Sequence, residues 1–413
     1  MKSDICIIGA GPAGLFAAIW AAQNGADVLI IERNTSAGRK LLRTGRGRCN
    51  ITHSGSITDF IKAYGRGGRF LRHSLYEFSA DDLRKYFAAR GLKTKVEKDG
   101  CVFPVTDRAT DVAQILLKEA NESEVRFMYG KSVREIQKQR DGFEIVTDRD
   151  SVEAKIVIIT TGGSSWAFTG STGDGYKFAK ALGHTIIESK AALCPLVTAE
   201  KWPGKLQGIA VPDVIIETKV SNHKFKVRGP LMFTGNGIGG PAVFDISRLV
   251  ADYLPDYENP LVMKIDFLPG YDLPQLDREL VDICAQHPKK SIASVISDFV
   301  RKSLAEKICE QMKFSNALTA GQFSKVQRKD LIHTLKGLVL SIVSTAPIEQ
   351  ATITKGGISA DEIEWKTMQS KICEGLYFAG EVMDVDGPCG GYNLQIAFST
   401  GRLAGLSAAN NLR

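Results

Sequence analysis

The stretch Ile5-Cys6-Ile7-Ile8-Gly9-Ala10-Gly11-Pro12-Ala13-Gly14 decides the fold. It is a short apolar run that enters a G-x-G-x-x-G pattern, followed by a small-residue segment from Leu15 to Asn24 and a second apolar run from Val28 to Ile31. This order predicts a strand, a helix and a parallel strand, with the glycines in the first turn. Gly9 would make the tight turn, Gly11 would admit a pyrophosphate, and Gly14 would let helix and strand pack closely. The stretch therefore predicts a bound dinucleotide, the alternative being a turn that serves only packing.

An acidic residue stands where such a unit needs one. Glu32 ends the second apolar run, 18 residues beyond Gly14. A carboxylate in that window accepts hydrogen bonds from a ribose 2′-hydroxyl. Pro12 and Ala13 open the helix, whose free N–H groups and partial positive charge favour phosphates. The acid makes the dinucleotide interpretation more specific than the glycine pattern alone.

A second stretch, Gly235-Asn236-Gly237-Ile238-Gly239-Gly240, also satisfies the glycine pattern. Pro241 follows at once, and no strand–helix–strand unit surrounds it. We therefore expect a simple turn there. If NADH or NADPH reduces the bound cofactor, it must then dock transiently, because no second nucleotide domain is available to it.

The bulk composition is typical of a globular protein. The chain has 413 residues, of which 44% are hydrophobic and 24% charged, with a net charge of +7. A mildly basic surface explains that charge without nucleic acid or membrane. No signal-peptide core or membrane-length apolar run is present, so we expect a cytoplasmic location. The eight cysteines form no C-x-x-C pair, so no metal site is predicted and reduced thiols are expected.

The order of signals along the chain predicts a discontinuous α/β domain. Strand and helix signals alternate to about residue 190 and resume near residue 350. We expect a Rossmann-like dinucleotide-binding domain over residues 1–190 and 350–413, an inserted β-rich domain over 191–270 and 340–349, and a helical subdomain over 271–339. Alternation over 214–220 and 225–228 predicts a β-hairpin. Helical periodicity predicts helices over 276–286, 292–312 and 331–343.

Four further glycine-containing stretches are suited to line a cofactor. A basic loop runs from Arg39 to Asn50, and Thr169–Gly175 precedes a helix. A strand ends in Gly380-Glu381, and Gly390–Gln395 opens the last helix. Glycines permit close backbone approach, and basic side chains balance phosphate charge. The N–H groups at the start of the last helix are suited to the negative charge that a reduced flavin carries.

These stretches resemble a known family, the bacterial NAD(P)/FAD-dependent oxidoreductases of the BaiN and aminoacetone oxidase type. The resemblance spans essentially the whole chain, and its closing run is the most specific part. The matching stretches are Lys40-Leu41, Gly45–Asn50, Val102–Pro104, Thr161–Gly163, Gly170–Tyr176, Phe233-Thr234, Gly237-Ile238, Gly240-Pro241, Thr354–Gly357 and Thr367–Gly401. The chain departs from the family pattern at Trp166 and Ala167, where a proline is common.

The resemblance implies FAD in the first unit and an FAD-binding domain interrupted by a β-barrel-like unit and a helical unit. It implies a pyrophosphate contact for Gly9, Gly11 and Gly14 with Pro12 and Ala13, a ribose contact for Glu32 beside Arg33, and an adenine cover from Val133. The implied flavin-side residues are Lys40, Leu41, Gly47, Arg48, Cys49 and Asn50. Gly380 and Glu381 would meet the ribitol or pyrophosphate, and Gly391, Tyr392, Asn393, Leu394 and Gln395 the isoalloxazine. Gly45, Thr161, Gly162, Gly163 and Asp386 are also expected to bind the cofactor.

The predicted function is an FAD-dependent oxidoreductase. Hydride would pass between flavin N5 and a small or steroid-like substrate, with NAD(P)H or O₂ as the other redox partner. Two alternatives stay open: an amine or aminoketone oxidase that releases hydrogen peroxide, and a flavin-binding protein with an RNA- or partner-linked role. Nucleic acid is not the expected partner, because the basic loop lies where cofactor phosphates should be. Tyr392 is the best candidate to touch substrate, but no signature assigns a catalytic side chain or an oligomeric state.

Overall fold

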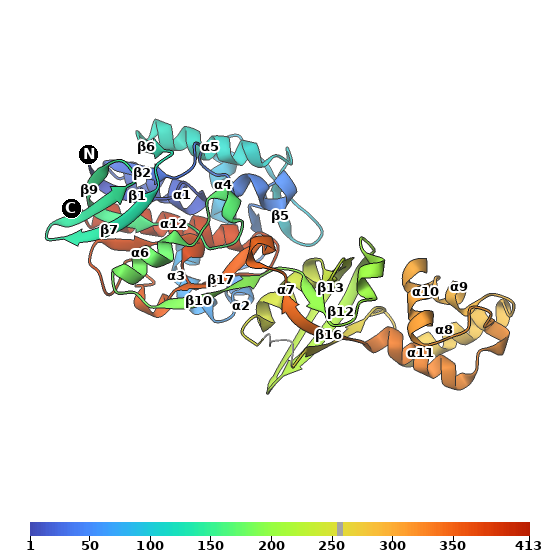
Figure 1. Cartoon of the computed structure of the whole chain (residues 1–413). Coiled ribbons are helices and arrows are strands. Elements are labelled where there is room, and N and C mark those ends of the chain that lie inside the picture. The colour runs from blue at the N-terminus through green and yellow to red at the C-terminus, as the bar shows by residue number, and fades with distance from the viewer. Residues whose placement is uncertain (254–258) are drawn as a thin grey trace. The chain divides into compact units, whose positions relative to one another are not determined.

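The computed structural model describes residues 1–253 and 259–413 (Figure 1). Contacts divide the chain into two compact units. The first comprises Met1–Lys190 and Ile348–Arg413, and the second Ala191–Pro347. Both chain ends therefore belong to the first unit, as a discontinuous domain requires.

A mostly parallel sheet forms the centre of the first unit. Its strand order is β6-β2-β1-β9-β8-β7, and β18 also pairs with β9. In the middle strand Ile7 stands between Ile30 of β2 and Ile158 of β9. These strands are buried on both faces, which explains their unbroken apolar runs. The strands are β1 (Lys2–Ile8), β2 (Val28–Glu32), β6 (Arg126–Tyr129), β7 (Val133–Gln139), β8 (Gly142–Thr147), β9 (Ser151–Ile159) and β18 (Leu376–Phe378).

Two small-residue helices from opposite chain ends pack together in this unit: α1 (Pro12–Ala22) and α12 (Tyr392–Asn410). A Cβ atom on Gly401 would stand 2.5 Å from the Ala13 carbonyl oxygen, and one on Gly405 would overlap the Ala17 carbonyl. The two glycines thus allow the helix backbones to approach closely. This contact brings the start of the last helix to the start of the first.

The remaining elements of the first unit surround this frame. They are η1 (Leu41–Gly47), β3 (Thr52–His53), α2 (Ile57–Ala63), α3 (Gly67–Glu77), α4 (Ala80–Ala89), β4 (Thr94–Val96), β5 (Cys101–Pro104), α5 (Ala109–Glu122), η2 (Ala167–Thr169), α6 (Asp174–Ala181), β10 (Ile186–Ala192), η5 (Ile348–Gln350), β17 (Ile353–Ile358), η6 (Ala360–Glu362) and η7 (Gly380–Val382). Strands β3, β5 and β4 make a small antiparallel sheet, and β10 pairs with β17.

A closed antiparallel barrel forms the centre of the second unit, in the order β11-β14-β13-β12-β15-β16. The barrel side chains and those of the following helices belong to one apolar cluster. The elements are β11 (Leu196–Thr198), η3 (Pro203–Leu206), β12 (Ala210–Val220), β13 (His223–Thr234), β14 (Gly237–Gly239), α7 (Pro241–Val250), β15 (Leu261–Asp266), α8 (Leu273–Gln286), α9 (Ile292–Ile296), α10 (Lys302–Gln311), η4 (Ala320–Gln322), α11 (Lys325–Gly337) and β16 (Leu338–Thr345). The three-part division predicted from sequence, with a separate helical subdomain, stays a prediction.

Two predicted helices are wrong in their extent. The segment 292–312 holds two helices, α9 and α10, because the chain leaves the helical conformation between Ser297 and Arg301. The segment 331–343 is helical only to Gly337, where β16 begins. In β16, Leu340 pairs with Met263 and Ile342 with Leu261. Barrel closure therefore overrides the local helical periodicity. Across the described part of the chain, no helix has the length and apolarity that crossing a membrane requires.

Candidate cofactor and active site

The three glycines of the first turn have different surroundings. Gly9 has a φ of +103°, and its carbonyl accepts a hydrogen bond from the Thr160 hydroxyl at 2.9 Å. A Cβ on Gly14 would overlap the Gly9 carbonyl oxygen, so both glycines are required by packing. Around Gly11, by contrast, no atom lies within 4 Å of the position a Cβ would take. Gly11 therefore leaves open space at the start of α1, where a pyrophosphate would approach the helix N-terminus.

Glu32 is held at the end of β2 by backbone N–H groups. Its carboxylate accepts hydrogen bonds from Ala10 N and Asn34 N, each at 2.8 Å, and its residue is only 7% exposed. The Lys131 amide donates to the Glu32 carbonyl at 3.1 Å, which brings the segment before β7 alongside. Val133, the predicted adenine cover, begins that strand and is buried. The structure thus brings the predicted ribose and adenine residues into one neighbourhood.

A polar cluster joins the basic loop to the Gly380-Glu381 turn. The Lys40 ammonium lies 2.6 Å from one Glu381 carboxylate oxygen and donates to the Ser165 hydroxyl at 2.9 Å. The other Glu381 oxygen accepts from Thr354 N at 2.9 Å. The Thr354 hydroxyl in turn accepts from the amides of Ser164 and Ser165. Four segments far apart in sequence are therefore fixed together around one carboxylate.

The glycines that follow β9 lie against this cluster. A Cβ on Gly163 would overlap the Thr354 side chain and stand 3.3 Å from the Glu381 carboxyl carbon. A Cβ on Gly162 would meet the Ser171 hydroxyl at 2.7 Å. The Thr161 hydroxyl is buried, and a Cβ on Gly175 would overlap it. Gly380 touches the start of α1, because a Cβ there would stand 2.9 Å from that of Ala13. The end of β9, the start of α1 and the Glu381 cluster are thus contiguous.

Two arginines of this region, Arg48 and Arg33, are paired with acids. Arg48 lies 2.7 Å from Glu97 and 3.5 Å from Asp107, and its guanidinium stacks 3.8 Å above the Phe103 ring. The hydrogen bond to Glu97 is the largest of the effects on the pKa of Arg48, and it raises that pKa. Arg33 similarly contacts Asp174 at 2.8 Å. Carboxylates of the protein therefore balance the charges of Arg48 and Arg33, whereas the sequence predicts that basic side chains of the loop from Arg39 to Asn50 balance phosphate charge.

The rest of that loop forms a backbone cradle. Leu41 and Cys49 are fully buried, and burial raises the Cys49 pKa to about 12, so it is a neutral thiol. Gly45 packs against the amide of Asn50, whereas no atom lies within 4 Å of a Cβ on Gly47. The Asn50 side-chain oxygen is buried and has no hydrogen-bond partner within the described protein. An acceptor in that state suits a ligand N–H group.

The start of α12 presents backbone N–H groups. Gly391 has a φ of +93°, and a Cβ there would overlap the Thr52 carbonyl. The first amide bonded within the helix is that of Gln395, to the Gly391 carbonyl at 3.1 Å. The amides of Tyr392, Asn393 and Leu394 therefore have no carbonyl to bond inside the helix. They form the end of α12 predicted to face the isoalloxazine.

Most side chains at this helix start have structural partners. The Asn393 amide bonds the backbone of Gly387 in the loop that also holds Asp386. The Gln395 side chain is fully buried and bonds the Thr52 hydroxyl at 2.7 Å and the Phe78 carbonyl at 3.1 Å. The side chains of Asn393 and Gln395 therefore bond to protein groups, and their contact with a flavin stays a prediction.

Tyr392 stands in an aromatic cluster. Its ring stacks on His53, with centroids 4.8 Å apart, and packs against Phe60 at 5.0 Å. Tyr64 meets it edge-on at 5.8 Å and donates its hydroxyl to the Tyr392 carbonyl at 2.9 Å. Burial raises the pKa of Tyr64 well above its ordinary value. The Tyr392 ring therefore packs against three other rings of the protein.

These residues fit FAD. No protein atom lies within 4 Å of a Cβ on Gly11 or Gly47, so a ligand can approach the backbone at both positions. The Asn50 side-chain oxygen lacks a hydrogen-bond partner within the described protein. The N-terminal amides of α12 follow Gly391, which packs against Thr52 of β3. Glu32 and the Lys40–Glu381 cluster supply fixed polar groups near the same backbone. Three residues of this arrangement were missed from sequence: Asn34, Ser165 and Thr354. Thr354 carried a signal, because it opens the family-matching stretch Thr354–Gly357.

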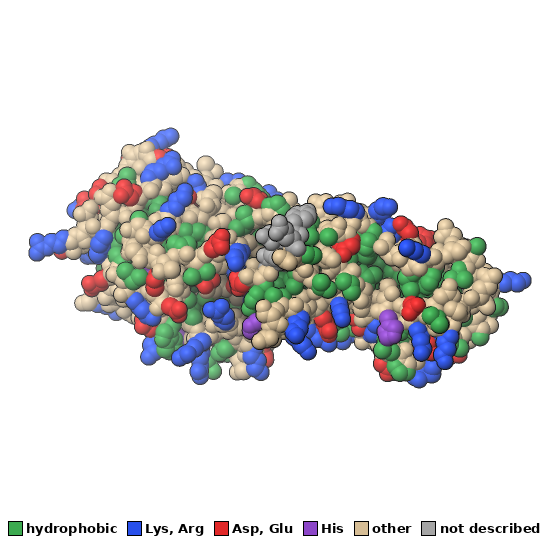
Figure 2. Space-filling model, turned by 60° about the horizontal axis from the view of Figure 1, so that its bottom comes forward, with side chains coloured by type: hydrophobic (Ala, Val, Ile, Leu, Met, Phe, Trp, Pro, Cys, Tyr) green, Lys and Arg blue, Asp and Glu red, His purple; other side chains and the backbone are tan. Residues whose placement is uncertain are grey.

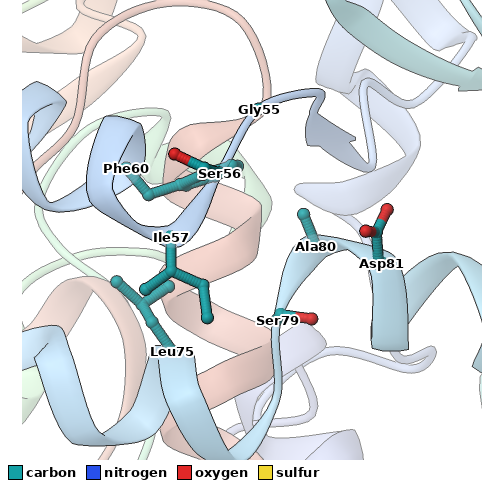
Figure 3. Close-up of a pocket in the computed structure, with 8 residues that line it drawn as sticks. All are labelled: Gly55, Ser56, Ile57, Phe60, Leu75, Ser79, Ala80 and Asp81. Carbon is teal, nitrogen blue, oxygen red and sulfur yellow. The ribbon is translucent and has the colours of Figure 1, made fainter.

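A hollow of about 130 Å³ lies beside the aromatic cluster and shares Phe60 with it (Figure 3). Ser56 and Ser79, which line it, cap α2 and α4 and bond Asp59 and Asp82. Because these serines are already partnered and the volume is small, we assign the hollow no ligand.

Comparisons with known proteins cover the whole chain. A sequence model described as the HI0933-like protein Rossmann domain matches residues 3–407. The chain is 32% identical over 408 residues to a 3-dehydro-bile acid delta(4,6)-reductase of Clostridium scindens, covering 98% of each chain. It is 31% identical over 405 residues to a ribosomal RNA dihydrouridine synthase of Escherichia coli, covering 97% of this chain and 96% of that one.

A solved structure shares the fold over the same extent. The 3-ketosteroid delta1-dehydrogenase from Sterolibacterium denitrificans, in complex with 1,4-androstadiene-3,17-dione, matches 99% of this chain and 100% of its own. The TM-score is 0.55 at 12% sequence identity. This likeness concerns the arrangement of the elements.

Proposed function

Because the chain belongs to the HI0933-like Rossmann family and is an FAD-dependent oxidoreductase, we propose that it reduces a carbon–carbon double bond conjugated to a carbonyl group. The observation that carries the proposal is the full-length similarity to two relatives whose names describe that kind of reduction. One name specifies a bile acid with conjugated double bonds, and the other the saturation of a uracil ring. We propose a small or steroid-like substrate first, because the bile acid reductase is 32% identical over 98% of the chain.

The chain's own residues hold and orient the reactants. The open backbone at Gly11 would receive the pyrophosphate, Glu32 the ribose, and Asn50 with the start of α12 the flavin ring. When bound, FAD would supply hydride chemistry at its N5 atom. The amides of α12 would favour negative charge beside them, and Tyr392 would bound the substrate side. NADH or NADPH provides the reducing equivalents.

The test begins with FAD-loaded protein reduced by dithionite without oxygen. It is mixed with a 3-oxo-Δ4,6 steroid, a uridine-containing RNA or O₂, and flavin reoxidation is followed at 450 nm. In a separate assay, oxidised protein is mixed with an aminoketone in air, and hydrogen peroxide is measured. We expect the steroid enone to reoxidise the flavin fastest and to gain two hydrogens by mass spectrometry. A colourless protein that takes up no FAD would contradict the proposal, as would hydrogen peroxide from an aminoketone as the sole product.

A second candidate is reduction of uridine in ribosomal RNA. The full-length similarity to the E. coli enzyme favours it, because a uracil ring also holds a double bond conjugated to a carbonyl. Basic and acidic side chains are interspersed on the face shown in Figure 2, so no large patch of one sign stands out on that face. The prediction that nucleic acid is not a partner therefore remains to be tested. Faster reoxidation by RNA than by the steroid, with binding that weakens steeply with salt, would support this candidate.

A further inference from the structure

The loop between β9 and α6 carries two neighbouring aromatic side chains, Trp166 and Phe168. The Trp166 and Phe168 rings lie 5.4 Å apart at 42°, and Phe168 is 61% exposed. Trp166 has a φ of +59°, a conformation that bulky residues rarely adopt. The exposed Phe168 ring beside a half-buried Trp166 on a strained backbone calls for an explanation, because neither the exposure nor the strain stabilises the free protein.

The loop that carries the pair is held rigidly. The Thr169 hydroxyl and amide both donate to the Trp166 carbonyl, at 2.7 and 2.8 Å. Ser165, immediately before it, is fixed by its amide to the Thr354 hydroxyl at 2.9 Å. The aromatic pair is therefore preorganised, so a planar ring could stack on it at little entropic cost.

The loop connects two features of the site. At its start, Ser165 bonds both Lys40 and Glu381. Towards its end, Asn34 donates to the Thr169 carbonyl at 3.0 Å and accepts from Arg39 at 2.7 Å. The Arg39 side chain is exposed and has no carboxylate partner among the described residues. An aromatic surface and an uncompensated cation thus belong to one bonded network beside the predicted cofactor site.

We propose that Trp166 and Phe168 form the stacking surface on which a reduced nicotinamide dinucleotide docks, with Arg39 facing its phosphates. This rests on the proposed function and supplies a place for the transient docking of NADH or NADPH that the sequence predicts. A dinucleotide fits better than a steroid, because it offers both planar rings to stack and negative charge for a guanidinium.

The test uses FAD-loaded protein and two non-reactive probes, the 1,4,5,6-tetrahydro forms of NADH and NADPH. Binding is measured by calorimetry, with tryptophan emission as a second readout. The variants are Phe168→Ala and Trp166→Gly, since glycine accepts a positive φ and removes the ring without strain. Tyr76→Ala is the matched control, because Tyr76 is a similarly exposed aromatic residue, at 56%, on a different element, α3.

We expect one of the two probes to bind and its Kd to rise about fivefold in Phe168→Ala and about tenfold in Trp166→Gly. Tyr76→Ala should bind as the wild type does. Absence of binding to the wild type, or unchanged Kd in both loop variants, would overturn the proposal. Loss of FAD from the loop variants would overturn it too, because the rings would then belong to the FAD site. Reoxidation of dithionite-reduced protein by an enone involves no nicotinamide, so it tests the proposed function separately.

Discussion

The same glycine pattern occurs once in each unit, at Gly9–Gly14 and at Gly235–Gly240, and folds in two different ways. In the first unit it joins β1 to α1 and leaves Gly11 open. In the second it is the hairpin between β13 and β14, where Thr234 pairs with Gly237. A Cβ on Gly237 would overlap the Leu196 carbonyl of β11. Protein atoms fill the space around the second pattern, whereas space at the centre of the first stays free.

The difference shows that the glycine pattern alone does not determine whether its backbone approaches a ligand or another strand. A glycine is needed wherever backbones approach closely, whether the neighbour is a ligand or a strand. Only the flanking strand, helix and acid distinguish the two cases, and the second pattern has none of them in the required order. The expected turn at Gly235–Gly240 is confirmed by the hairpin pairing.

The largest effect is expected from Gly14→Ala in the first pattern. Its Cβ would overlap the Gly9 carbonyl and stand 2.5 Å from the Thr160 hydroxyl, so the turn or α1 must move. We expect about 3 kcal/mol of lost stability and loss of FAD together. Thermal denaturation with simultaneous flavin fluorescence measures both. A variant that keeps its melting temperature but loses FAD would show that Gly14 acts on the cofactor and not on packing.

In the second pattern, Gly237→Ala should separate stability from cofactor binding. Overlap with the Leu196 carbonyl would open the contact between β14 and β11 and cost about 2 kcal/mol. FAD content, measured from absorption, should stay at the wild-type value, because the residues that fit FAD lie in the other unit. If FAD affinity falls as far as in Gly14→Ala, the two patterns are not distinct in function.

A smaller effect, confined to affinity, is expected for Gly11→Ala. No atom lies within 4 Å of its Cβ position and its φ is −77°, so the free protein should keep its stability. The new methyl group would occupy the pyrophosphate side and raise the FAD Kd about tenfold, about 1.4 kcal/mol. Gly270→Ala is the control, since its Cβ also meets open space. Equal FAD affinity in the two variants would refute the role of Gly11.

Those features that depend on the order of residues within one segment of the chain could be predicted from the sequence. The family resemblance, the Rossmann-type fold and the flavoenzyme class are confirmed, whereas the roles of the individual site residues stay predictions. The missed partners could not be read locally: Thr354 and Ser165 meet Glu381 only because distant segments converge. The acidic partners of Arg48 could not be predicted for the same reason, since Glu97 and Asp107 come from other segments.

The smallest expected effect is on the melting temperature at acidic pH, where the histidines of the two units differ. In the first unit His184 is buried, with Nε2 2.8 Å from the Ser370 hydroxyl and Nδ1 3.2 Å from Glu362. Burial lowers the His184 pKa below 6.5, and Glu362 opposes this only in part. The histidines of the second unit, His223, His287 and His333, are exposed.

Because the His184 pKa is depressed in the folded state, the unfolded chain takes up a proton first as the pH falls. Its contribution to stability is therefore complete above pH 6.5 and is lost as the pH falls towards the folded pKa. Wild-type protein should lose about 1–2 °C of melting temperature between pH 7 and 5.5 relative to His184→Gln, whose amide does not titrate. Glu362, whose pKa is lowered chiefly by its hydrogen bond from Thr185, adds a separate loss only below pH 4.5. Parallel pH profiles for wild type and variant would place the acid sensitivity outside this cluster, and the buried histidine would no longer distinguish the units.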